Sequence, residues 1–251
     1  MAEPGSLRER YRRVRFPSGH HPDADIRALF ARAAEAGHRA PPPETARVLE
    51  LGCADGGHLA AMAAELPSAH FTGVDLALHE PARGPNLELH EGDLSQLSGS
   101  FDYVLAIGLF SWVEQPRSVV EAILRCLAPG GVAAVSFNVM PGWCDWLRAR
   151  ELLRFHCEHL EDPAEQLAAA HQALHLYLRC GGDPALRPLA EGRWDEWLFH
   201  EFLAPYNHPM RLGRFIEQVA PLRVLGLSGK EELEDFVGGR KVRTELLVRG
   251  L

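Results

Sequence analysis

The sequence predicts an α/β protein built on a doubly wound, mostly parallel sheet. Residues 48–51 are an apolar run that meets glycines at positions 52, 56 and 57, and residues 58–65 are rich in helix formers. A second apolar run, residues 70–76, follows and holds Asp75 near its end. Strand, glycine turn, helix, strand and acid in this order form the first half of a Rossmann-like nucleotide-binding unit.

An acid in the first strand indicates which nucleotide this unit holds. Glu50 stands where a dinucleotide-binding fold has glycine, because the pyrophosphate must approach the helix N-terminus. A carboxylate repels phosphate and suits a cation. S-adenosylmethionine lacks phosphate and carries an ammonium and a sulfonium group, so Glu50 with Gly52 and Gly56 favours this cofactor over NAD.

The connection that follows Asp75 is short. A crossover between parallel strands takes about a dozen residues or more and is usually helical. Residues 77–86 contain Pro81, Gly84 and Pro85, which disfavour a helix. We therefore expect a loop or a single turn before a third strand at residues 87–90.

The rest of the chain continues the alternation and then departs from it. Fourth and fifth strands are expected at residues 102–107 and 132–138, around a helix at residues 116–127. Helical patterns then dominate up to residue 221. Two last strands, at residues 222–227 and 242–248, flank a helix predicted at residues 231–237. The sequence is predicted to have three parts. An N-terminal substrate-side segment covers residues 1–45, a core covers residues 46–140 and 222–251, and a helical insert covers residues 141–221.

Five arginines between positions 8 and 15 surround Tyr11 in the N-terminal segment. We favour a solvated face for them over the alternative, a basic lip for an acidic substrate or partner. Asp23 is expected to cap a helix that runs to about residue 36.

Composition excludes several classes of protein. The 251 residues are 46% hydrophobic and 24% charged, as in a globular protein with one core and an inserted subdomain. A net charge of −8 argues against general nucleic-acid binding. The sequence has neither an apolar signal segment nor a membrane-spanning run, so we expect a cytoplasmic protein without a membrane partner. The five cysteines form no C-x-x-C pair, and the histidine pairs lack a third ligand at a diagnostic spacing, so no metal site is expected.

Five stretches of the sequence carry a family resemblance: VLELGCADGG, HFTGVDLA, FDYVLAIGLFSWV, LAPGGVAAVSFNVMPGW and LFHEFLAPYNHP. Through them, residues 11–248 resemble class I S-adenosylmethionine-dependent methyltransferases. More narrowly, they resemble the methyltransferase core of the "methyltransferase regulatory domain" family, which includes rickettsial protein-lysine methyltransferases of outer-membrane proteins. The chain departs from that family in ending without the regulatory domain and in lacking the helix after Asp75. The resemblance implies a seven-stranded sheet of order 3-2-1-4-5-7-6, with the insert between strands five and six.

The resemblance also implies a set of cofactor-binding residues: Glu50, Gly52, Cys53, Ala54, Asp75, Leu76, Asp93, Leu94, Ile107 and Gly108. By this resemblance, Glu50, Gly52 and Ala54 would hold the methionine end of the cofactor. Asp75 would hold the ribose hydroxyls. Asp93 with Leu94 would contact the adenine, although spacing alone equally allows a turn aspartate. Ile107 and Gly108 would lie beside the sulfonium.

Methyl transfer from a sulfonium is an in-line displacement in which alignment supplies most of the rate. The acceptor must present a lone pair, so a base is expected near the methyl group. The candidate bases are His20, His21, His200 and Glu201, although a structural role is commoner for any one of them. The predicted substrate contacts are Tyr11, Phe110, Trp112, Trp143 and Tyr206, for which packing is the commoner role.

The sequence thus predicts a methyltransferase that converts S-adenosylmethionine into S-adenosylhomocysteine, with a protein lysine as the acceptor. Two alternatives stay open. One is a small-molecule N- or O-methyltransferase, and the other is a non-catalytic module that only binds the cofactor. The sequence indicates no oligomeric state.

Overall fold

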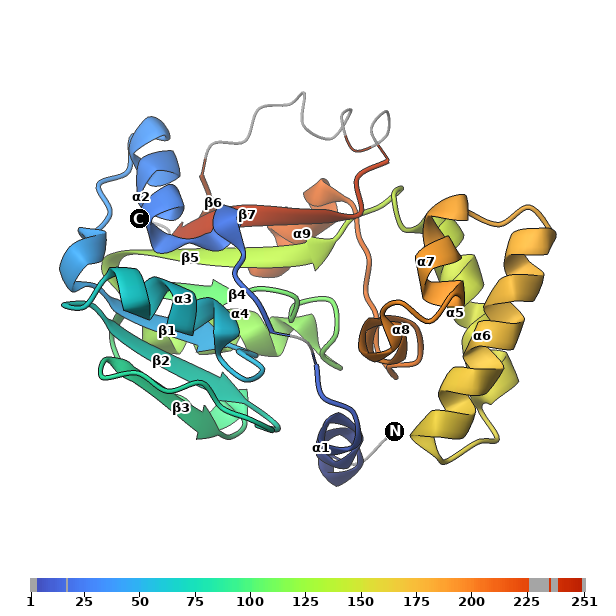
Figure 1. Ribbon diagram of the computed structural model, residues 1–251. Coiled ribbons are helices and arrows are strands. Elements are labelled where there is room, and N and C mark those ends of the chain that lie inside the picture. Colours follow the sequence, from blue (N-terminus) through green and yellow to red (C-terminus); the bar gives the residue numbers. More distant parts are fainter. Residues whose placement is uncertain (1–3, 17, 226–234, 236–238, 250–251) are drawn as a thin grey trace.

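A single mixed sheet organises the computed structural model, which describes residues 4–16, 18–225, 235 and 239–249. Its strand order is β3-β2-β1-β4-β5-β7-β6 (Figure 1), which confirms the predicted order. The strands from β3 to β5 are parallel, whereas β7 is antiparallel to both β5 and β6. The strands are β1 (Arg47–Leu51), β2 (His70–Asp75), β3 (Leu87–Glu91), β4 (Phe101–Ala106), β5 (Leu127–Asn138), β6 (Leu222–Val224) and β7 (Val242–Arg249).

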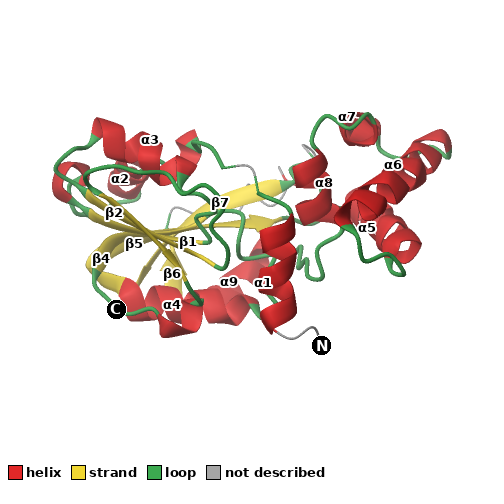
Figure 2. Cartoon of the chain, turned by 60° about the horizontal axis from the view of Figure 1, so that its bottom comes forward, coloured by secondary structure: helices red, strands yellow, loops and turns green. Residues whose placement is uncertain are grey.

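Different helices cover the two faces of the sheet (Figure 2). Helices α2 (Ile26–Glu35) and α3 (Gly57–Glu65) lie on one face, and α4 (Pro116–Cys126) and α9 (Leu212–Val219) lie on the other. Side chains of a strand alternate between its faces, so Val48 packs in the α3 layer and Leu49 in the α4 layer. The same alternation turns Glu50 towards the α3 layer.

Helix α9 packs in the core of the sheet although it falls within residues 141–221. Phe215 stacks on Phe137 with ring centroids 4.1 Å apart, and it meets Phe110 edge-on at 5.3 Å. Leu212 and Val219 join the same buried cluster. The boundaries of the helical insert therefore stay a prediction, and its last helix belongs structurally to the sheet.

The other helices of residues 141–221 form a bundle beyond the C-terminal ends of the parallel strands (Figure 1). These helices are α5 (Cys144–Cys157), α6 (Pro163–Arg179), α7 (Arg187–Ala190) and α8 (Asp195–Phe202). Their own buried cluster includes Leu153, Leu174 and Phe199. No helix in the described part of the chain is long and apolar enough to cross a membrane.

The N-terminal segment forms a helix, α1 (Pro4–Arg13), which the sequence analysis did not predict. It lies across the strand ends near α8, where the Arg10 guanidinium sits 4.0 Å above the Phe199 ring. The cap of α2 also differs from expectation. Asp25, and not Asp23, accepts a hydrogen bond from the Arg27 backbone N–H, because a short 3-10 turn at Pro22–Ala24 precedes the helix.

The link between β2 and β3 has no helix, as predicted from its prolines and glycine. Asn86 stabilises the end of this link, since its amide donates to the backbone carbonyls of Leu66 and Ala69 at 3.0 and 2.9 Å. The helix predicted at residues 231–237 lies outside the described residues except for Asp235.

Candidate active site

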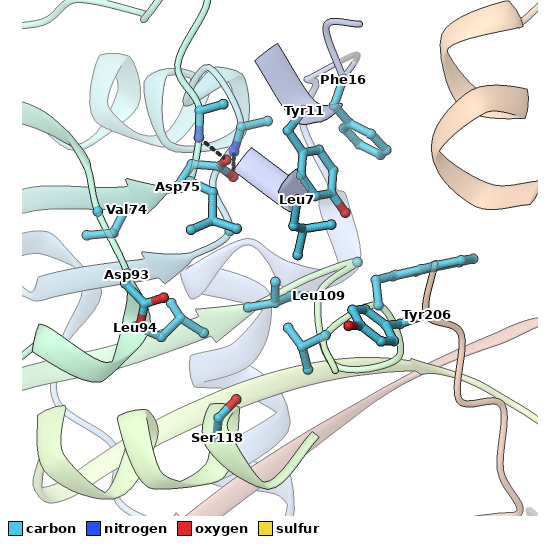
Figure 3. A pocket seen from close by; sticks show the side chains of 18 of the residues that line it. Leu7, Tyr11, Phe16, Val74, Asp75, Asp93, Leu94, Leu109, Ser118 and Tyr206 are labelled. Carbon is cyan, nitrogen blue, oxygen red and sulfur yellow. Dashed lines mark hydrogen bonds between the residues drawn. The ribbon is translucent and has the colours of Figure 1, made fainter. Parts of the chain in front are cut away.

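A cavity of about 390 Å³ lies at the C-terminal ends of the parallel strands, beneath α1 and beside α8. Figure 3 shows Asp75 and Asp93 on one side of it and Tyr206 on the other, while Leu7 and Tyr11 reach in from α1. Open α/β sheets bind ligands at this edge. The cavity is therefore the candidate active site.

The loop that joins β1 to α3 forms part of the cavity wall and has an unusual backbone. Gly52 and Gly56 have φ values of 71° and 77°, a conformation that favours glycine. Ala54 has a φ of 46°, although it carries a Cβ. Residues held in sparsely populated conformations gather at binding sites, where neighbouring contacts fix them.

Asp75 is the contact that fixes this loop. Its carboxylate accepts hydrogen bonds from the backbone N–H groups of Ala54 at 2.9 Å and Ala77 at 3.0 Å (Figure 3). Asp75 therefore holds two segments that line the cavity, the loop after β1 and the link after β2. Each carboxylate oxygen retains a second lone pair for a ligand hydroxyl.

Glu50 lies one layer behind the cavity wall. It is only 3% exposed, and its Oε2 has no hydrogen-bond partner among the described residues. Burial, with a smaller contribution from the Asp75 charge, raises the pKa of Glu50 to about 8. A buried carboxylate without a partner is costly in a folded protein, so it points to a cationic ligand that compensates it.

Eight of the predicted cofactor-binding residues line the cavity: Gly52, Ala54, Asp75, Leu76, Asp93, Leu94, Ile107 and Gly108. Asp93 caps a turn and also has a place in the cavity wall. Its Oδ1 accepts the Ser95 N–H at 2.7 Å and caps a short 3-10 turn, and the residue also faces the cavity.

Cys53 does not face the cavity, which corrects its predicted role. Its side chain packs in the buried cluster of the α3 layer, where a Cβ added to Gly73 would lie 2.6 Å from the Cys53 sulfur. Burial raises the pKa of the thiol far above its usual range, so it is an inert core residue.

Ion pairs attach α1 and the residues that follow it to the ends of the strands and their loops. Arg15 donates to Asp55 Oδ2 at 2.7 Å, and Asp55 Oδ1 accepts the His79 backbone N–H at 2.8 Å. Arg12 forms an ion pair with Glu91 at the end of β3. Four of the five arginines pair with the protein's own carboxylates, and the fifth, Arg10, lies over the Phe199 ring. The segment is thus neither a plain solvated face nor a lip for an acidic ligand.

His200 and Glu201 are the candidate bases that line the cavity. His200 is committed to structure: its Nε2 donates to the Val14 carbonyl at 2.8 Å, and its ring stacks on Tyr11 with centroids 5.1 Å apart. Burial lowers the pKa of His200 to about 4, which keeps the ring neutral. Burial raises the pKa of Glu201 to about 8.

His20 and His21 lie away from the cavity, which corrects their prediction as bases. The His20 Nε2 is 3.2 Å from Asp25 Oδ2, and the His21 backbone N–H donates to His58 Nδ1 at 3.2 Å. These contacts hold the segment before α2 against α3. Sequence proximity to the strand ends does not place the two rings in the site.

Some of the predicted substrate contacts line the cavity, and the others lie outside it. Tyr11, Trp112 and Tyr206 line the cavity, whereas Phe110 is fully buried against Phe215 and Trp143 lies behind Trp112 at 5.7 Å. The roles predicted for Phe110 and Trp143 are therefore corrected to packing. The lining residues that sequence reasoning missed include Leu7, Phe16, Asp55, His79 and Val113.

Comparison with known proteins agrees with this geometry. A family model described as a methyltransferase domain matches residues 20–151. The uncharacterized proteins RP789 and RP028 of Rickettsia prowazekii (strain Madrid E) are 28% and 29% identical over 72% and 74% of this chain. The alignments cover 37% of RP789 and 84% of RP028.

A solved structure, PKMT2 from Rickettsia typhi in complex with AdoHcy, superposes on 93% of this chain with a TM-score of 0.75 and 27% sequence identity. The chain spans 55% of that protein's length. Trans-aconitate 2-methyltransferase from Deinococcus radiodurans is 32% identical over 47% of this chain.

Proposed function

The chain belongs to the methyltransferase domain family, and we propose that the protein transfers a methyl group from S-adenosylmethionine to the amine of a protein lysine. The fold is that of class I S-adenosylmethionine-dependent methyltransferases. In this proposal Asp75 binds the ribose, Asp93 and Leu94 bind the adenine, and Glu50 acts on the cationic end of the cofactor.

The observation that carries the proposal is the carboxylate of Glu50. It is buried behind the cofactor loop with an unpartnered oxygen, and Asp75 and Asp93 add two more acids to the same region. A pyrophosphate next to three carboxylates would be repelled, whereas an ammonium or sulfonium would be attracted. The arrangement therefore supports S-adenosylmethionine and disfavours NAD.

The lysine acceptor is supported by the sequence resemblance to rickettsial protein-lysine methyltransferases and by the similarity to PKMT2. A small-molecule acceptor is the second candidate, supported by the similarity to trans-aconitate 2-methyltransferase. The charge of the cavity weighs against a tricarboxylate, because Glu114 and Glu201 line it together with the acids of the cofactor side.

Isothermal titration tests the cofactor. We expect S-adenosylmethionine and S-adenosylhomocysteine to bind and NAD not to bind. Glu50→Gln should weaken S-adenosylmethionine by about tenfold or more, since a charge-assisted contact contributes roughly 1.5–3 kcal/mol. Glu88→Gln, which alters an exposed acid of β3, is the matched control and should leave affinity unchanged. Binding of NAD in preference to S-adenosylmethionine would reject the proposal.

Methyl transfer separates an enzyme from a module that only binds cofactor. A lysate is incubated with the protein and methyl-labelled S-adenosylmethionine, and labelled products are identified by mass spectrometry. We expect label on lysine side chains. Label on small molecules would favour the second candidate, and cofactor binding with no label in any fraction would favour a binding module.

A further inference from the structure

The cavity has an acceptor side that differs in character from its cofactor side. Tyr11 and Phe16 supply aromatic surface there, packed against His200 of α8, and Tyr206 lies across the cavity from Asp75 and Asp93 (Figure 3). Trp112 also lines the cavity. Aromatic faces attract organic cations and tolerate aliphatic chains. This side of the cavity is therefore suited to a long side chain that ends in a positive charge.

The charges on the acceptor side are negative. Glu114 and Glu201 both line the cavity. Among the described residues that line it, Arg125 alone is arginine or lysine, and it donates to the Leu94 carbonyl at 2.7 Å on the adenine side. The described residues that line the acceptor side thus include no arginine or lysine.

Glu201 lines the cavity without a hydrogen-bond donor from the described residues. It is 9% exposed, and no hydrogen bond from a described residue reaches its carboxylate. Arg150 is the cation whose charge acts on it, but the Arg150 guanidinium donates to the backbone carbonyls of Glu201 and Phe202 at 3.1 and 3.0 Å. A buried acid of this kind is stabilised when a ligand ammonium meets it.

The neighbouring histidine is not an alternative to Glu201 as a general base. The Nε2 proton of His200 is held by the Val14 carbonyl, and its ring is packed between Tyr11 and Phe16. Its basicity is also low, because burial lowers its pKa to about 4. Glu201 keeps a raised pKa of about 8, close to the pH at which a general base is most effective.

We infer that Glu201 binds the ammonium group of the acceptor and takes its proton before methyl transfer. The inference rests on the proposed function, since it needs S-adenosylmethionine on the cofactor side. One N–H bond of the ammonium breaks, and its proton passes to the Glu201 carboxylate. The freed nitrogen lone pair forms the C–N bond while the methyl–sulfur bond breaks and its electron pair stays on sulfur. The products are a methylated ammonium, S-adenosylhomocysteine and a proton that Glu201 later gives to solvent.

Two bisubstrate probes test the inference without knowledge of the natural acceptor. Each is S-adenosylhomocysteine with its sulfur replaced by a nitrogen, which carries an aminobutyl chain in one probe and a carboxybutyl chain in the other. The wild-type protein should bind the amine probe at least about tenfold more tightly than the carboxylate probe. Glu201→Gln should bring that ratio close to one, while S-adenosylhomocysteine affinity stays within about twofold.

Glu196→Gln is the matched control, because Glu196 lies on the same helix but is exposed, and it should keep the wild-type ratio. In single turnover on a lysine peptide, Glu201→Gln should be slower by about a hundredfold or more. Equal binding of the two probes by the wild-type protein overturns the inference, and so does an amine preference that survives in Glu201→Gln. Those two results, with S-adenosylhomocysteine bound normally, reject the inference alone. Failure of S-adenosylhomocysteine itself to bind rejects the proposed function as well.

Discussion

Asp75 and Glu50 belong to neighbouring strands but use their carboxylates differently. Asp75 holds two backbone N–H groups and faces the cavity, whereas Glu50 is buried behind it with a free oxygen. Asp75 therefore has structural dependants although it also faces the cavity. Loss of Asp75 should disturb the loop and the ligand together.

Asp75→Asn should lower both stability and cofactor affinity. The amide nitrogen cannot accept a hydrogen bond, so the N–H of Ala54 or Ala77 loses its partner at a cost of about 2 kcal/mol, roughly 4–8 °C in Tm. Calorimetry of thermal unfolding and titration with S-adenosylmethionine measure the two effects. Asp102→Asn is the control, since Asp102 accepts the Arg47 N–H remote from the cavity and should affect stability alone. Wild-type affinity in Asp75→Asn would contradict the ribose role.

Glu50 should make the cofactor-free protein less stable as pH rises. Its pKa is about 8 in the folded state and near the ordinary glutamate value of 4.5 when unfolded. The folded state therefore holds a proton that the unfolded state has released between these pH values, and stability falls across that window. Glu50→Gln should remove this part of the fall, so its Tm relative to wild type should increase from pH 5 to pH 8. A constant difference in Tm would show that Glu50 is ionised in the free protein.

The predicted cofactor-binding residues that line the cavity follow strands in the sequence, whereas the positions of those that lie elsewhere depend on tertiary contacts. The strand-end positions of Asp75 and Asp93 follow from spacing along the chain. The core position of Cys53 depends on the gap that Gly73 leaves on the neighbouring strand. The roles of His20 and Trp143 likewise depend on partners far along the chain, which no local pattern contains.

At the scale of elements, helix α1 covers the cavity, and ion pairs attach it and the residues after it to the strand ends. Arg12→Ala combined with Arg15→Ala removes the pairs with Glu91 and Asp55. Exposed ion pairs contribute up to about 1 kcal/mol each, so dissociation of S-adenosylhomocysteine should become about twofold to tenfold faster.

Stopped-flow displacement of the product measures this rate. Arg214→Ala is the control, because its ion-pair partner, Glu217, lies on the same helix, α9. The double variant should also lose its difference from wild type at high salt, where exposed ion pairs are screened. An unchanged dissociation rate at low salt would mean that α1 does not restrain the ligand.

Helix α9 should behave as part of the core. Phe215→Ala removes a ring that stacks on Phe137, and the cavity left behind should cost about 3–5 kcal/mol in the free energy of unfolding. Ile216→Ala is the matched control, since Ile216 is 38% exposed, and it should cost less than about 1 kcal/mol. Urea titration measures both. Similar small losses in the two variants would place α9 with the helical insert.

The strands and the missing crossover helix could be predicted because apolar runs, glycines and prolines are local signals. Helix α1 could not, because its residues are mostly arginine and polar, and only Leu7 and Tyr11 reach the cavity. Its position depends on carboxylates of loops that follow much later in the sequence. The cap of α2 was predicted two residues too early for a similar reason. Asp23 and Asp25 are both suitable capping residues, but Pro22 begins a 3-10 turn that contains Asp23, so that Asp25 is the residue before the helix.

At the scale of the whole molecule, the sheet and the helical bundle each contribute one side of the site. The sheet contributes the loops with Asp75, Asp93 and Gly108, and α8 contributes His200 and Glu201. Segments from Leu7 to Tyr206 thus meet over a single cavity. The resemblance to a family supplied the strand order, but the pairing of an acidic cofactor side with an acidic, aromatic acceptor side required the folded structure.

A crystal structure with S-adenosylhomocysteine tests the central claim most directly. We predict the ribose hydroxyls on the Asp75 carboxylate, the adenine beside Asp93 and Leu94, and the amino group of the ligand turned towards Glu50. The sulfur should point to the side that holds Glu201. A ligand bound outside this cavity, or one whose amino group lies away from Glu50, would contradict the account.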